Sequence, residues 1–105
     1  MTLAGKAKED HSGFKGSYIL RETLVNGYPC WLKTGNGSQE AIWFSRVGSA
    51  WLVGSKDNLG TKYGRISGPD GKDSYPNEIK QGWRYAENGE FVDAGPNDVL
   101  FKAIG

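Results

Sequence analysis

Short runs of aromatic and β-branched residues recur along the chain, and each pair of runs is separated by a glycine-containing turn. Asn-Gly pairs stand between two such pairs of runs, at 26–27 and 88–89. Asn and Gly both accept the positive φ of a type I′ turn, so this dipeptide between β-prone runs indicates a hairpin. A third pair of runs, 41–45 and 50–53, surrounds a turn at 47–49. The pattern therefore predicts three hairpins.

The alternation of side chains in the second hairpin predicts its buried face. A turn at 48–49 and a turn at 47–48 both place the same four apolar residues on one face, because the register shifts by two. Those residues are Ile42, Phe44, Trp51 and Val53. Trp43 and Leu52 then share the opposite face. We expect the four-residue face to belong to the core.

The two Asn-Gly hairpins give less uniform predictions. In the hairpin around 88–89, Tyr85 shares a face with Val92, and Arg84 lies opposite Asp93, where unlike charges favour the register. In the hairpin around 26–27, both faces are partly apolar, so both could be covered. A regular ladder there would place Leu24 on the same face as Trp31 and Leu20.

The remaining segments complete an all-β prediction. Residues 1–15 are polar and read as a flexible tail, and 16–105 form a single β domain. The glycine-rich stretch 55–82 is either a long loop or hides a short strand around 62–67, since loops of this length are uncommon in small domains. The run 99–104 is predicted as a strand. We expect an antiparallel meander of about six or seven strands, curled into a small sandwich or an open barrel.

Composition narrows the classes of partner. The chain has 105 residues, with 13 basic and 12 acidic side chains and a net charge of +1. Dedicated nucleic-acid binders carry a clear basic excess, so nucleic acid is not the expected partner. The single cysteine, Cys30, excludes an intramolecular disulfide. No apolar run reaches the length of a membrane span or of a secretory signal, which favours a cytoplasmic protein.

The residues of common catalytic sites are missing or poorly placed. The one histidine, His11, lies in the predicted tail, where a catalytic geometry cannot be held. Asp70 and Asp73 do not have the spacing of a calcium loop, and no phosphate-binding glycine motif occurs. Most other carboxylates lie at turns. We therefore predict a protein that is not an enzyme and holds no cofactor and no metal.

The aromatic residues are the best candidates for binding. Trp and Tyr on a rigid sheet lose little side-chain entropy when they contact a partner. Two tyrosines of the long loop, Tyr63 and Tyr75, are predicted to be exposed next to two cations. The predicted binding residues are Trp43, Lys62, Tyr63, Arg65 and Tyr75.

These residues support more than one function. The first hypothesis is a module that recognises a protein partner through exposed aromatics and the 55–82 loop. The alternative is a carbohydrate-binding module in which Trp or Tyr stacks on sugars. A small hydrolase that uses turn carboxylates ranks last.

One longer pattern resembles a known kind of module. Residues 26–33 read Asn-Gly-Tyr-Pro-Cys-Trp-Leu-Lys, and the aromatic runs 42–44 and 51–54 follow. A later proline and a Trp…Gly-x-aromatic hairpin complete the pattern, at Pro76, Trp83, Gly89 and Phe91. Over about residues 17–104 the chain resembles a short Trp- and Gly-punctuated β module of multidomain eukaryotic proteins. The resemblance implies a non-catalytic module and supplies no active-site residues.

Overall fold

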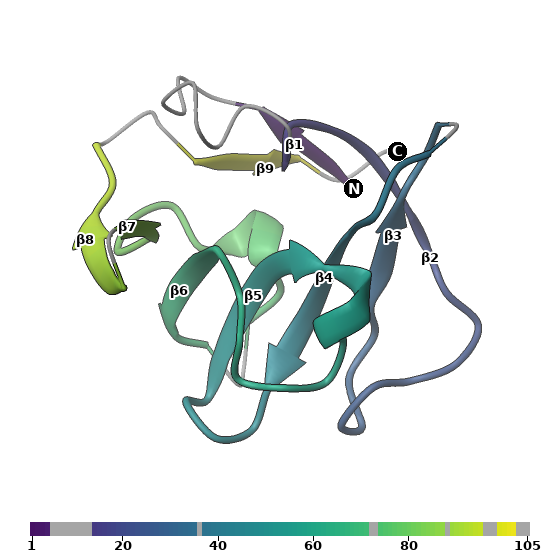
Figure 1. The fold of residues 1–105 in the computed structure, drawn as a ribbon, viewed down its shortest axis with the longest axis horizontal. Coiled ribbons are helices and arrows are strands. Elements are labelled where there is room, and N and C mark those ends of the chain that lie inside the picture. The colour runs from purple at the N-terminus through teal and green to yellow at the C-terminus, as the bar shows by residue number, and fades with distance from the viewer. Residues whose placement is uncertain (5–13, 36, 72–73, 88, 96–98, 103–105) are drawn as a thin grey trace.

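The computed structural model describes residues 1–4, 14–35, 37–71, 74–87, 89–95 and 99–102. Within them, every strand pairs antiparallel to its neighbours in one sheet, which curls into a half-barrel (Figure 1). The strand order is β8-β7-β6-β5-β4-β3-β2-β1-β9. The strands are β1 (Thr2–Ala4), β2 (Gly16–Leu20), β3 (Trp31–Lys33), β4 (Glu40–Ser45), β5 (Ala50–Ser55), β6 (Ile66–Asp70), β7 (Arg84–Glu87), β8 (Glu90–Asp93) and β9 (Leu100–Lys102).

The predicted fold class is confirmed, although the described residues contain nine strands rather than six or seven. The meander runs without interruption from β1 to β8, and only β9 departs from it by pairing with β1. In Figure 1, the β1–β9 pair lies across the open side of the curled sheet. This pair covers the concave face.

The prediction of a flexible tail is wrong for the first four residues. Thr2–Ala4 forms β1, which pairs with both β2 and β9. Met1 and Leu3 are buried, because alternate residues of β1 point into the concave face. His11 and the rest of 5–13 lie outside the described residues.

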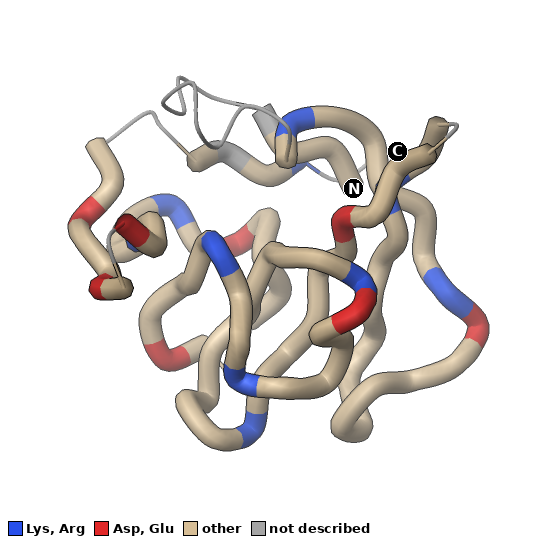
Figure 2. Tube along the Cα trace, in the orientation of Figure 1, with Lys and Arg blue, Asp and Glu red and all other residues tan. Residues whose placement is uncertain are grey.

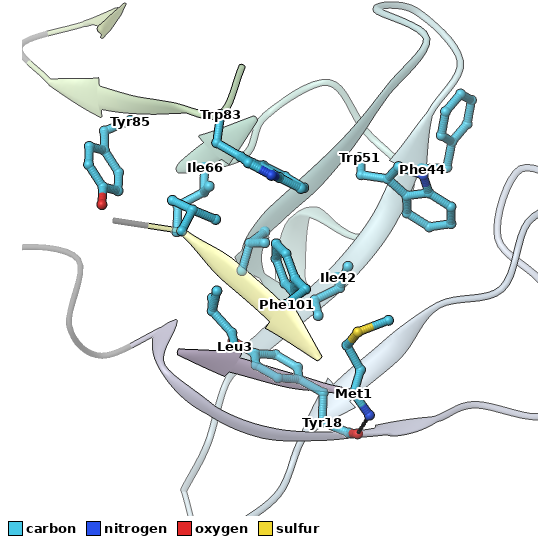
Figure 3. Packing of buried hydrophobic residues seen from close by; sticks show 12 residues of the cluster. Met1, Leu3, Tyr18, Ile42, Phe44, Trp51, Ile66, Trp83, Tyr85 and Phe101 are labelled. Carbon is cyan, nitrogen blue, oxygen red and sulfur yellow. Dashed lines mark hydrogen bonds between the residues drawn. The ribbon is translucent and has the colours of Figure 1, made fainter. Parts of the chain in front are cut away.

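The main core fills the concave side of the half-barrel. Figure 3 shows Leu3 and Phe101, from the β1–β9 pair, facing side chains of β4 to β7. The Phe101 and Trp83 rings lie 4.8 Å apart between centroids. The twelve buried members are Met1, Leu3, Tyr18, Ile42, Phe44, Trp51, Val53, Ile66, Trp83, Tyr85, Val99 and Phe101. The face predicted for the second hairpin is therefore confirmed as core.

A second, smaller core lies on the convex side. Trp43 and Leu52 pack there with Cys30 and Ala41, and all four are buried. Val25, Leu32 and Leu59 pack against them and are partly buried. Burial raises the pKa of the Cys30 thiol, and the neighbouring Arg21 opposes that rise. Cys30 is thus a small buried hydrophobe, as its position in a β run suggests.

The hairpin between β4 and β5 has one of the two predicted registers. Phe44 pairs with Trp51 and Ile42 with Val53, which is the register of the 47–48 turn. The turn itself is longer and spans 46–49, with Ser49 at φ 51°. In the β7–β8 hairpin, Arg84 lies opposite Asp93 as predicted, with 3.5 Å between Nε and Oδ1. Both registers depend on local turns that the sequence specifies.

The hairpin around Asn26-Gly27 is less regular than predicted. Asn26 and Gly27 have φ values of 56° and 82°, which are those of a type I′ turn. Val25 and Tyr28 exchange backbone hydrogen bonds beside it. Further along, however, Ile19 pairs with Leu32, so residues 21–24 lie opposite only 29–30. The two extra residues loop outward, and Leu24 is exposed instead of sharing a covered face.

The stretch 55–82 is not a single long loop. It contains a central strand, β6, and two short 3₁₀ helices, η2 (Lys56–Asn58) and η3 (Pro76–Glu78). The alternative of a hidden strand is therefore correct, but β6 starts four residues later than the expected 62–67. Gly68 lets the Trp83 ring pack closely on this strand, because a Cβ there would lie 3.1 Å from the ring. Glycine in a strand, together with Pro69, concealed β6 from the sequence pattern.

Candidate functional site

The five predicted binding residues do not form one site. Trp43 has no exposed surface, and its indole N–H donates to the Thr61 carbonyl at 2.9 Å. The convex core encloses the ring, so Trp43 cannot stack on a partner, and its prediction as a binding residue is corrected. The other four residues are divided among three hollows of the surface.

Tyr63 and Arg65 line one hollow together. It has a volume of about 590 Å³ and is lined by Phe14, Gln39, Glu40, Ser55, Asn58, Tyr63, Gly64 and Arg65. Tyr63 is exposed, as predicted. Glu40 already has partners, because its carboxylate lies 3.8 Å from the Lys33 ammonium and accepts a hydrogen bond from the backbone N–H of Gln39. We call this the Tyr63 hollow.

Lys62 borders a different hollow, on the convex face of β5 to β8. The Lys62 ammonium lies 5.6 Å from the centroid of the Tyr63 ring, which lines the Tyr63 hollow. Two carboxylates, Asp70 and Asp93, also line it, and Asp93 pairs there with Arg84. Among the described residues, no three His, Cys, Asp or Glu side chains gather as metal ligands would.

Tyr75 belongs to an apolar groove on the concave side. The groove has a volume of about 500 Å³ and lies where β2 passes the 3₁₀ helix η3. Its lining includes no charged side chain. The lining residues are Met1, Tyr18, Ile19, Leu20, Trp31, Tyr75 and Asn77. We call this the Tyr75 groove.

The side chains at the rim of the Tyr75 groove are unusually exposed for their type. Ile19 is 61% exposed, Leu20 is 60% exposed and Tyr75 is 51% exposed. Ile19 and Leu20 are consecutive in β2, so their side chains point to opposite faces of the sheet, and Leu20 is the one on the concave side. Exposed apolar surface beside a hollow of a folded protein often marks an interaction site. Exposure of Tyr75 was predicted, but sequence reasoning missed Ile19 and Leu20. The signal in the sequence that could have indicated them is that both faces of the first hairpin carry apolar residues.

The buried ring of Trp51 packs against two aromatic rings of the groove, those of Trp31 and Tyr75. Trp31 lies 5.7 Å from Trp51 between ring centroids, and Tyr75 lies 6.3 Å away in an edge-to-face arrangement. Trp51 is itself buried, and its indole N–H donates to the Ser74 carbonyl at 2.6 Å. Both groove rings therefore rest on a fixed support.

The backbone at Tyr75 is fixed as well. The Tyr75 N–H donates to the Glu78 carboxylate at 2.7 Å, and the Glu78 N–H donates to the Tyr75 carbonyl at 2.9 Å. Pro76, at the first position of η3, is buried and sets the helical φ in advance. The groove thus presents preorganised side chains, which lowers the entropy cost of binding.

Charge plays a smaller part on this surface. Figure 2 shows basic and acidic residues interspersed along the described trace, as the near-zero net charge implies. No helix in the described part of the chain is long and apolar enough to span a membrane.

Comparisons with protein-family models, with curated proteins and with solved structures gave no match. The resemblance to the Trp- and Gly-punctuated module therefore stays a prediction. The function must be argued from the hollows themselves, and the Tyr75 groove is lined by three exposed apolar side chains, Ile19, Leu20 and Tyr75, with the buried Trp51 ring beside it.

Proposed function

We propose that this chain is a non-enzymatic interaction module that binds a protein partner through the Tyr75 groove. One observation carries the proposal: Ile19, Leu20 and Tyr75 expose half or more of their surface around a hollow that has no charged side chain in its lining. The α-ammonium of Met1, which also lines the hollow, donates to the Tyr18 carbonyl. Water is a poor solvent for such a surface, and a protein partner with apolar side chains would cover it.

The residue types of the groove suit recognition of a protein. Trp and Tyr are enriched among the residues that dominate binding energies at interfaces, and Trp31 and Tyr75 are both held rigidly on Trp51. Full burial of an aliphatic side chain contributes roughly 1.5–3 kcal/mol. Covering Leu20, which points to the concave side, would therefore supply part of a micromolar affinity, which corresponds to about 8 kcal/mol.

The proposal can be tested with a displayed library of random peptides. Peptides selected on the wild-type protein should bind at least about tenfold more weakly to Leu20→Asp and Tyr75→Ala, because both changes alter the groove. Val47→Asp is the matched control, since Val47 is 80% exposed and lies outside the groove. Selected peptides that bind all three variants equally, or no selected peptides at all, would refute the proposal.

A second function is favoured by the Tyr63 hollow. It offers an exposed phenol ring and Phe14 among amide, hydroxyl and guanidinium groups, which is the mixture that sugars use for stacking and hydrogen bonding. A carbohydrate-binding module would give signals on a glycan array that Tyr63→Ala abolishes and Tyr75→Ala leaves unchanged. An array without any signal would leave the protein partner as the better proposal.

A further inference from the structure

Hydrogen bonds fix the segment between β5 and β6 that forms one wall of the Tyr63 hollow. At its end, the Arg65 N–H donates to a β5 carbonyl at 2.8 Å. In its middle, the Thr61 carbonyl accepts the indole N–H of Trp43 at 2.9 Å. The Thr61 hydroxyl accepts from the Tyr63 N–H at 3.1 Å and donates to the Asn58 carbonyl at 2.7 Å. The wall of the hollow is therefore formed before any ligand arrives, which lowers the entropy cost of binding.

A close backbone approach brings a phenol ring and a guanidinium to the same hollow. Gly64 lies directly on β5, where a Cβ would come within 2.9 Å of the Leu52 side chain. Tyr63 and Arg65, the two neighbours of Gly64, both line the hollow. Glycine at this position thus lets the segment pack on the sheet and holds both side chains at the hollow.

The two charged side chains that line the hollow differ in their partners. The Glu40 carboxylate has the Lys33 ammonium at 3.8 Å and the backbone N–H of Gln39 at 2.6 Å. The Arg65 side chain is exposed, and its guanidinium forms no ion pair with any residue that the structure describes. The charge of Glu40 is therefore compensated within the protein, whereas the charge of Arg65 is available to a ligand.

The uncharged part of the lining suits a sugar ring. The Tyr63 side chain is 63% exposed, so a ring can stack on it. The side chains of Gln39, Ser55 and Asn58 offer amide and hydroxyl groups for the hydroxyls of a sugar. The volume of about 590 Å³ lies in the range of sites for small molecules.

We infer that the Tyr63 hollow binds a sugar that carries one negative charge, as a uronic acid or a sulfate ester does. This inference rests on the carbohydrate-binding function proposed above as the second function, and it names the class of ligand. The Arg65 guanidinium donates two parallel hydrogen bonds to oxygens of the anionic group, because its planar fork of donors fits such a pair. The sugar ring stacks on Tyr63.

The charges of the hollow favour this ligand over the alternatives. A neutral sugar that covered Arg65 would remove water from the guanidinium without supplying an opposite charge. A phosphate with two negative charges would exceed the single free guanidinium and would be repelled by the Glu40 carboxylate in the same lining. A sugar with one negative charge balances Arg65 and leaves the pair of Glu40 and Lys33 intact.

A glycan array with matched pairs tests the inference on the full chain. Each acidic glycan stands beside its uncharged counterpart, which is the methyl ester of a uronate or the desulfated form of a sulfated sugar. Titration calorimetry then measures both members of the pair that gives the strongest signal. We expect the acidic member to bind about tenfold or more tightly than its counterpart. The two acidic series show whether a carboxylate or a sulfate is the recognised group.

Substitution of two arginines gives the matching test on the protein side. Arg65→Gln removes the guanidinium but keeps the backbone N–H that bonds to β5, so the variant should fold. Arg84→Gln is the matched control, because it changes the net charge equally and Arg84 lines a different hollow. We expect only Arg65→Gln to bind the acidic glycan about tenfold or more weakly, with binding of the uncharged counterpart unchanged. If Arg65→Gln fails to fold, the matched glycans carry the test alone.

The outcomes separate the inference from the proposed functions. Equal binding of acidic glycans and their counterparts would overturn the charge preference, and so would equal losses in Arg65→Gln and Arg84→Gln. If neutral sugars still bind and Tyr63→Ala abolishes their binding, the carbohydrate function stands without the preference. An array without any signal would overturn both. The peptide selection on the Tyr75 groove is independent of all these results.

Discussion

At the scale of single residues, three tryptophans do more than fill the core. Their indole N–H groups each donate to a backbone carbonyl of the irregular segment 55–82: Trp43 to Thr61, Trp51 to Ser74 and Trp83 to Ile79. A buried indole N–H needs a partner, and here the partners are loop carbonyls that would otherwise be unsatisfied. The tryptophans thereby fix a segment that has little regular secondary structure.

Trp51→Phe tests this role and its link to the groove. The substitution removes the bond to the Ser74 carbonyl and part of the support under Trp31 and Tyr75. We expect the free energy of unfolding in urea to fall by about 1–3 kcal/mol. Binding of groove-selected peptides should weaken as well. Trp83→Phe is the control, because it loses the bond to Ile79 but does not border the groove.

The raised pKa of the buried Tyr18 phenol predicts how the free energy of unfolding changes at alkaline pH. Burial, followed by the nearby Glu40 charge, raises the pKa of its phenol well above the usual range. Below about pH 10 the phenol is protonated in both states, so stability is unaffected. Above that pH only the unfolded state ionises, and stability falls by at most about 1.4 kcal/mol per pH unit.

Denaturation in urea between pH 9 and about 11 would measure the contribution of Tyr18. Tyr18→Phe should be less stable at neutral pH, since it lacks the 2.6 Å bond to the Phe14 carbonyl, but its stability should decline less steeply with pH. Identical slopes for the two proteins would show that Tyr18 does not titrate differently on folding.

At the scale of elements, the sequence predicted the features that depend on nearby residues and missed those that depend on distant ones. The β4–β5 and β7–β8 hairpins were predicted with correct face assignments, because turn and alternation lie within about twelve residues. The prediction for the first hairpin was wrong at residues 21–24, because nothing in the local sequence indicates that these four residues lie opposite only 29–30. β6 was concealed by Gly68 and Pro69, and Gly68 packs against Trp83, fifteen residues later.

The candidate site was predictable only in part for the same reason. Exposure of Tyr63 and Tyr75 followed from their glycine-rich surroundings. The Tyr75 groove did not, because its lining comes from Met1, β2, β3 and η3, which are far apart in the sequence. These pairings join distant parts of the chain, and a single sequence does not reveal them.

Proline substitution tests the register of β2 directly. Ile19→Pro removes an N–H that bonds to β3, whereas Leu20→Pro removes one that faces away from β3. We expect Ile19→Pro to lower the free energy of unfolding by roughly 1–3 kcal/mol more than Leu20→Pro. Chemical denaturation of the two variants, with Ile19→Ala and Leu20→Ala as controls for the side chains, would measure this difference. The opposite order would mean that the register is shifted by one residue.

At the scale of the whole molecule, stability depends on the β1–β9 pair that covers the concave core (Figure 1). Leu3 and Phe101 pair across this ribbon and are both buried. A domain of this size is stabilised by only about 5–15 kcal/mol. The first few residues therefore matter as much as the central strands.

Leu3→Ala measures that dependence. Truncation of a buried leucine costs about 2–5 kcal/mol, and the cavity would open between β1 and the sheet. We expect a cooperative but clearly lowered thermal transition. Thr2→Ala is the matched control, because Thr2 is only partly buried and lies on the opposite face of the same strand. Equal transitions for both variants would indicate that β1 adds little to the fold.

The Trp31–Trp51 pair also gives the molecule an optical signature. Two indoles 5.7 Å apart and inclined by 55° couple their electronic transitions, so the far-ultraviolet circular dichroism should include an exciton couplet. Trp31 faces the groove while Trp51 is sealed beneath it. Occupation of the groove should therefore shift the emission of one indole to shorter wavelength, and the unlabelled protein would report its own ligand.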